Sequence, residues 1–96
     1  MKALTMYVTK RSPSDKKYVI ENVTDYEGNV KPQRIGRLVN PFGEIKPGMI
    51  AEFAYLDENP KCLVTSMVLE KIYKDNLLII KTMNSIYTLR EYHDKD

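Results

Sequence analysis

Two residues of this sequence are common agents of nucleophilic or metal chemistry, and each is the only one of its type: Cys62 and His93. A single cysteine cannot form an intrachain disulfide or supply a cysteine metal cluster. We therefore predict that Cys62 is a buried or half-buried structural thiol. His93 lies in a polar segment, EYHDKD at residues 91–96, where a solvated side chain is expected.

Other signatures of catalysis are missing from the sequence. A hydroxyl or thiol nucleophile needs a neighbouring base, and the G-x-S-x-G elbow does not occur. The four glycines, at positions 28, 36, 43 and 48, never stand closer than five residues apart, so no glycine-rich phosphate loop is formed. Asp57 and Glu58 suit a solvated turn better than a metal site. We expect no enzyme activity, no metal, no cofactor and no small-molecule substrate, with carboxylates that meet only in three dimensions as the open alternative.

Short stretches of alternating apolar and polar residues, or of β-branched and aromatic residues, predict the elements of the fold. They lie at residues 4–9, 18–24, 35–39, 49–56 and 62–73, followed by a hairpin or two consecutive strands within 75–92. In the second stretch, Val19 and Val23 are assigned to one face and Tyr18 and Ile20 to the other. Residues 62–73 also admit two helical turns behind Ser66, but their β-branched residues favour a strand.

Proline and glycine separate these stretches. Gly28 and Asn29 suit a turn, and Gly36 marks a bulge or a close backbone approach. Residues 40–48 hold two prolines and two glycines, which predicts a compact loop. In this loop, Phe42 and Ile45 are the residues that could anchor it to the core or contact a partner.

The spacing of about ten residues between strands predicts an all-β fold. For a chain of 96 residues we expect one domain over residues 1–92 and a polar tail at 93–96. The predicted architecture is a small antiparallel, partly open barrel, SH3-like or OB-like, with six to seven short strands and at most one short helical turn.

Composition and charge restrict the partners. No apolar run approaches the roughly 18 residues of a membrane-spanning helix, and no signal-peptide core is found, so a cytoplasmic protein without a membrane partner is expected. The net charge is only +2, but residues 1–48 carry +4 and residues 49–96 carry −2. This asymmetry could steer a charged partner, or it could disappear when the two halves interleave in the fold.

Two short patterns contain hydroxyl residues: the pair Thr65-Ser66 and the series Thr82-x-Asn84-Ser85-x-Tyr87. A resemblance to known sequences rests on these patterns. Over residues 35–90 the chain resembles small uncharacterised all-β proteins of low-GC bacteria and their phages or mobile elements. The resemblance implies a fold and no activity. By their own chemistry, these hydroxyls and the Asn84 amide are expected to bond the backbone where the strand turns, and Tyr87 to bury its ring.

Two functions of different classes remain. The first is a non-catalytic protein-interaction module, an adaptor or accessory protein that binds a protein partner or a second copy of itself, with Phe42 and Ile45 as candidate contacts. The second is a single-stranded nucleic-acid-binding barrel, in which aromatic rings stack on bases. Its candidate phosphate contacts are basic: Lys10, Arg11, Lys16, Lys17, Lys31, Arg34 and Arg37. An inhibitor protein of a phage or mobile element is a minor variant of the first.

Overall fold

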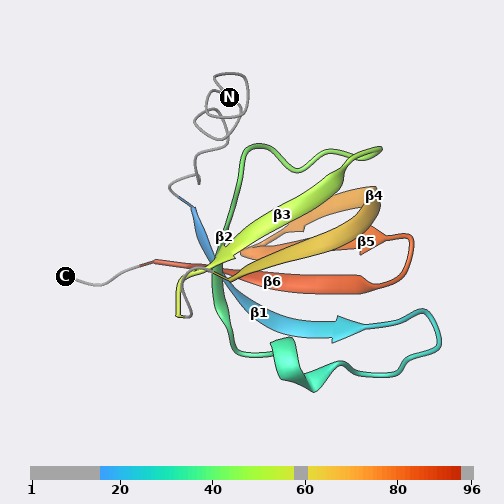
Figure 1. Ribbon diagram of the computed structural model, residues 1–96, viewed down its shortest axis with the longest axis horizontal. Coiled ribbons are helices and arrows are strands. Elements are labelled where there is room, and N and C mark those ends of the chain that lie inside the picture. Colours follow the sequence, from blue (N-terminus) through green and yellow to red (C-terminus); the bar gives the residue numbers. More distant parts are fainter. Residues whose placement is uncertain (1–15, 58–60, 94–96) are drawn as a thin grey trace.

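The structure is a computed structural model that describes residues 16–57 and 61–93 (Figure 1). Its elements are β1 (Lys17–Thr24), a 3-10 helix η1 (Pro32–Arg34), β2 (Leu38–Pro41), β3 (Ile50–Tyr55), β4 (Cys62–Lys74), β5 (Leu77–Thr82) and β6 (Ile86–Tyr92). The predictions of an all-β antiparallel fold with six to seven strands and at most one helical turn are confirmed, with six strands and one 3-10 turn in the described residues. The strand predicted at residues 4–9 lies outside the described residues.

Each strand pairs antiparallel with its neighbours in the sequence, and β1 pairs with β6. The sheet therefore closes into a barrel, where a partly open one was expected. The closing ladder is long, from Lys17 opposite Tyr92 to Thr24 opposite Ile86. Because the strands follow one another in order around the barrel, the arrangement is a meander and not the Greek key of an OB fold.

The longest strand, β4, is shared between two ladders. Its first half, up to Met67, pairs with β3, and its second half, from Val68, pairs with β5. A register shift between Val68 and Glu70 accompanies the change of partner. Bulges of this kind increase the bend and twist of a strand, so β4 folds over one end of the barrel. This confirms the strand preferred for residues 62–73.

Alternate residues of the six strands fill the barrel, which contains no tryptophan. The largest fully buried side chains are Tyr18, Phe53, Ile20, Leu63, Leu78, Ile80 and Leu89. In β1 the predicted faces are partly wrong, because Val23 is buried together with Tyr18 and Ile20. The cause is a register shift between Ile20 and Asn22, which turns the second half of the strand by one position.

Three local predictions need correction. Residues 35–37 do not join a strand, because η1 begins at Pro32 and Gly36 has a positive φ of 89°. The bulge or close backbone approach predicted at Gly36 is wrong: its N–H donates to Ile20 O at 2.7 Å, but a Cβ at this position would have open space, so it is the positive φ that favours glycine. Cys62 is exposed at the start of β4 and is not the buried thiol that was expected. None of the helices among the described residues has the length and apolar character to span a membrane.

Candidate interaction surface

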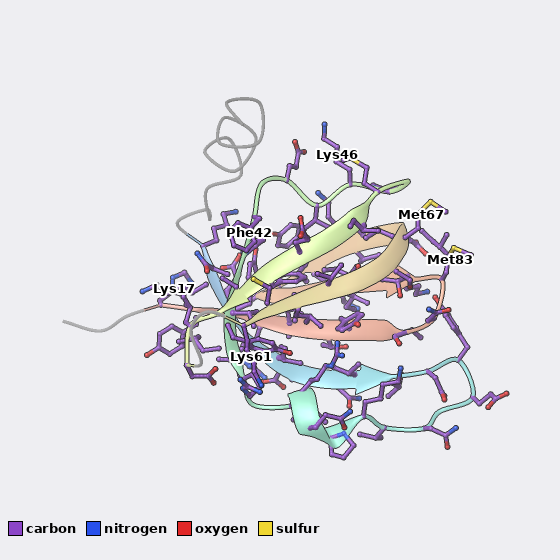
Figure 2. The ribbon with its side chains drawn as sticks, viewed as in Figure 1. Lys17, Phe42, Lys46, Lys61, Met67 and Met83 are labelled. Atoms are coloured by element: carbon purple, nitrogen blue, oxygen red, sulfur yellow. The ribbon has the colours of Figure 1, made fainter. Side chains whose placement is uncertain are left out.

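Four large apolar side chains lie exposed around the bend of β4, and we call them the methionine face: Met49, Ile50, Met67 and Met83. Their exposed fractions are 56%, 53%, 38% and 57%. Ile50 stands opposite Met67 in the ladder between β3 and β4, and Met83 N donates to Met67 O at 2.9 Å. In Figure 2, Met67 and Met83 lie near one another and point away from the barrel. The sequence indicated these residues only through its methionine content.

Backbone hydrogen bonds fix the turns that carry this face. Gly48 N donates to Val68 O, and Val68 N donates to Met49 O, both at 2.8 Å. Gly48 has a positive φ of 91°, a conformation that costs a residue with a side chain more than glycine. The loop before β3 is therefore held against β4 at the position where β4 bends.

A cluster of hydroxyl groups holds the turn between β5 and β6. The Thr82 hydroxyl donates to Ser85 O at 3.0 Å and accepts from Ser85 N at 3.0 Å and from Asn84 N at 3.3 Å. The Ser66 hydroxyl accepts from Asn84 N at 3.1 Å, which joins the turn to β4. The structural role predicted for these hydroxyls is therefore confirmed, and they position Met83.

Tyr87 lies beside this turn and is buried, as expected. Burial raises the pKa of its hydroxyl, and the nearby Arg34 guanidinium partly opposes the rise. Lys31 Nζ donates to Ser85 Oγ at 3.1 Å. Tyr26, in the loop after β1, donates its hydroxyl to Thr82 O. The β1–β2 connection therefore supports the turn from the other side.

The two loop residues singled out in the sequence have different environments. Ile45 is 7% exposed and belongs to the core, so it anchors the loop. Phe42 is half-buried, and its N–H donates to Glu52 O at 2.9 Å. A groove of about 450 Å³ runs between this loop and the start of β3. It is lined by Phe42, Gly43, Glu44, Ile45, Met49, Ile50, Ala51 and Glu52, so it joins the loop to the methionine face.

The loop borders a second depression of about 270 Å³, on the side of Lys16 and Tyr18. The Tyr18 and Tyr73 hydroxyls are 2.6 Å apart there. Burial, together with the Tyr73 hydroxyl, raises the pKa of Tyr18 well above its ordinary range. Lys71 Nζ donates to Ile45 O at 2.8 Å, which ties the loop to β4. Both hydrogen-bonded pairs line the depression.

The basic residues considered for phosphate binding do not form one patch among the described residues. Lys16 and Lys17 lie at the end of the barrel where β1 begins, near Tyr92 and His93. Lys31 lies beyond the other end of β1, where its N–H donates to Val23 O. Lys10 and Arg11 lie outside the described residues.

Two basic candidates remain. Arg34 ends η1, with its guanidinium near the Tyr87 hydroxyl, and Arg37 is held by its own chain. Its guanidinium bonds both carboxylate oxygens of Asp57 at 3.2 Å and lies 4.2 Å from the centre of the Tyr55 ring. The hydrogen bonds from Arg37 lower the pKa of the Asp57 carboxyl, because they stabilise its charged form. Arg37 is thereby oriented along the barrel wall.

The residue types associated with catalysis are dispersed. His93 is exposed and contacts only Glu91 among the ion pairs of the described residues, at 3.3 Å. Cys62 is exposed on β4, and within residues 16–57 and 61–93 no three His, Cys, Asp or Glu side chains could hold a metal ion. The methionine face and the adjoining groove are therefore the strongest site candidates.

Comparisons of the chain with protein-family models, curated proteins and solved structures found no match. The candidate function consequently depends on the geometry and chemistry of the chain itself.

Proposed function

We propose that this chain is a non-catalytic protein-interaction module that binds a protein partner, or a second copy of itself, through the methionine face. The observation that carries the proposal is the grouping of Met49, Ile50, Met67 and Met83 at one end of the barrel, each more than a third exposed. The buried core of the described residues contains no methionine, so these three methionines are not part of what fills the barrel.

The chemistry of the face suits protein contact. Methionine side chains are flexible and polarizable, and they are used at surfaces that adapt to a partner. Grouped apolar residues at a surface mark interaction sites more often than single ones do. The turns that carry these residues are held by buried or short hydrogen bonds, so little backbone ordering is required when a partner binds.

Size-exclusion chromatography with light scattering, together with pull-down from the lysate of the host, tests the proposal. The wild-type chain should self-associate or retain a defined protein. The double variant Met67→Asp/Met83→Asp should weaken that association at least about tenfold, because central apolar contacts each contribute more than about 1 kcal/mol to binding.

A matched control is available at the opposite end of the barrel, where Leu56 and Tyr92 are 41% and 42% exposed. The double variant Leu56→Asp/Tyr92→Asp introduces the same charge and should leave the association unchanged. A wild-type chain that stays strictly monomeric and retains no protein would contradict the proposal. Equal losses in both double variants would contradict the assigned surface.

A further inference from the structure

The start of β3 extends beyond the ladder that joins it to β2. A bond from Phe42 N to Glu52 O, at 2.9 Å, lies at the end of this ladder. At Gly43 the chain leaves the extended conformation, with a positive φ of 72°. Ile50 and Ala51, the first two residues of β3, therefore lie beyond the end of β2.

The backbone groups of Ile50 are directed away from β4. Successive residues of a strand direct their N–H and C=O groups alternately to its two sides. Ala51 N donates to Thr65 Oγ1 at 3.0 Å, on the side of β4, whereas Glu52 O accepts on the side of β2. The N–H and C=O of Ile50 therefore face the side of β2, in the orientation that an added strand needs for pairing.

The groove beside this edge has the space and the lining for such a strand. Its volume is about 450 Å³, within the roughly 300–1,000 Å³ of ligand pockets. Phe42 and Met49 give it apolar walls, and its charged lining residues, Glu44 and Glu52, are both acidic. Glu44 has Lys46 at 3.7 Å, but both side chains are more than half exposed, so water screens this ion pair. The lining therefore complements apolar and basic side chains.

We propose that the partner bound by the methionine face contributes an extended peptide segment, which pairs with the backbone of Ile50 as an added strand. The segment places apolar side chains on Phe42 and Met49 and basic side chains beside Glu44 and Glu52. The inference rests on the proposed function and deepens it, because it names the kind of segment that covers this part of the face. The backbone bonds fix the register of the segment, and the apolar contacts contribute most of the affinity.

Selection of peptides on the immobilised wild-type chain tests the inference, with a phage-displayed library of random decapeptides as the probe. The selected peptides should alternate apolar with polar positions and contain more basic than acidic residues. Fluorescence anisotropy of the synthetic peptides then gives their dissociation constants. A library that yields no binding peptide, or only peptides rich in acidic residues, would overturn the inference.

Two substitutions at position 50 separate the backbone bond from the side-chain contact. Ile50→Pro removes an N–H that is directed away from β4, and proline is tolerated at the first residue of a strand. It should weaken peptide binding at least about tenfold, because a carbonyl of the peptide would lose its donor. Ile50→Val keeps the N–H and should change the affinity less than about threefold. Equal affinities of the two variants would overturn the inference.

Methylation of the peptide backbone gives a second measurement that leaves the chain unchanged. Each amide nitrogen of a selected peptide is methylated in turn. Binding should be lost when the residue opposite Ile50 is methylated and retained when either neighbour is, because the N–H groups of the neighbours point to the other side. No loss at any position, or the same loss at every position, would overturn strand pairing.

These measurements separate the inference from the proposed function. If a protein is retained through Met67 and Met83, and Ile50→Pro retains as much of it as Ile50→Val, the assigned surface stands and strand pairing is overturned. Slow hydrogen exchange of the Ile50 N–H in the unbound chain would also overturn it, because this edge would then already be paired. Dimerisation that Ile50→Pro abolishes would do so as well, because a second copy would then supply the added strand.

Discussion

Replacing Thr82 with valine removes one hydroxyl and almost no volume. Thr82 is fully buried, and its hydroxyl makes three hydrogen bonds within the turn between β5 and β6. After the change, Asn84 N keeps Ser66 Oγ as an acceptor, and Ser85 O keeps the N–H of residue 82 as a donor. Only the Ser85 N–H, in a residue that is 3% exposed, loses its partner.

A buried donor without a partner costs about 1–3 kcal/mol, so Thr82→Val should lower the free energy of unfolding by that amount. Urea unfolding followed by far-UV circular dichroism measures the loss. The m-value, the slope of the free energy of unfolding against urea concentration, should be the same in the variant and the wild type. Thr88→Val is the control, because Thr88 lies half-buried on the outside of β6. It should change the free energy by less than about 0.5 kcal/mol. The reasoning about the turn would be refuted if Thr82→Val were as stable as the control.

Two predictions concern pH. The pKa of Tyr18 is raised by burial above its ordinary value of 10.0, so the unfolded chain loses this proton first and stability falls as the pH rises past that value. Tyr18→Phe should reduce the slope of the free energy of unfolding against pH above this value, by up to about 1.4 kcal/mol per pH unit. Urea unfolding at a series of alkaline pH values measures this slope, and the same slope in the variant and the wild type would contradict the raised pKa of Tyr18. The pKa of Asp57 is lowered by Arg37, so the stabilisation is present above the ordinary value of 3.8 and is lost as the pH falls through the lower folded value. Asp57→Asn should lower the free energy of unfolding by less than about 1 kcal/mol at neutral pH, because the Arg37–Asp57 pair is exposed. The difference in free energy between variant and wild type should vanish in acid, and a difference that stays constant with pH would contradict stabilisation by this pair.

The alternation of apolar and polar residues was sufficient to predict the strands, because one face of each strand had to be buried. Residues 49–56 show this well, since Ala51, Phe53 and Tyr55 share the predicted face and are all buried. The hydroxyl residues after β5 were assigned correctly for a local reason, because a threonine side chain can bond the backbone of its own turn.

The errors arose where a nonlocal bond changed the local pattern. Val23 was assigned to the wrong face, because a bulge shifts the register between Ile20 and Asn22 only in the presence of β6. Closure of the barrel depends on the pairing of β1 with β6, which no short window of sequence contains. The methionine face was missed for the same reason, because Met49, Met67 and Met83 are far apart in the sequence and meet only when β4 bends.

The closing ladder determines how the barrel responds to mechanical force. Lys17 and Tyr92 stand opposite one another, so the chain enters and leaves the barrel at neighbouring points. A force applied through both ends pulls β1 away from β6 one residue pair at a time, in the manner of a zipper, and does not shear the whole ladder at once. Mechanical opening should therefore begin beside Lys17 and Tyr92 and reach the turn that carries Met83 last.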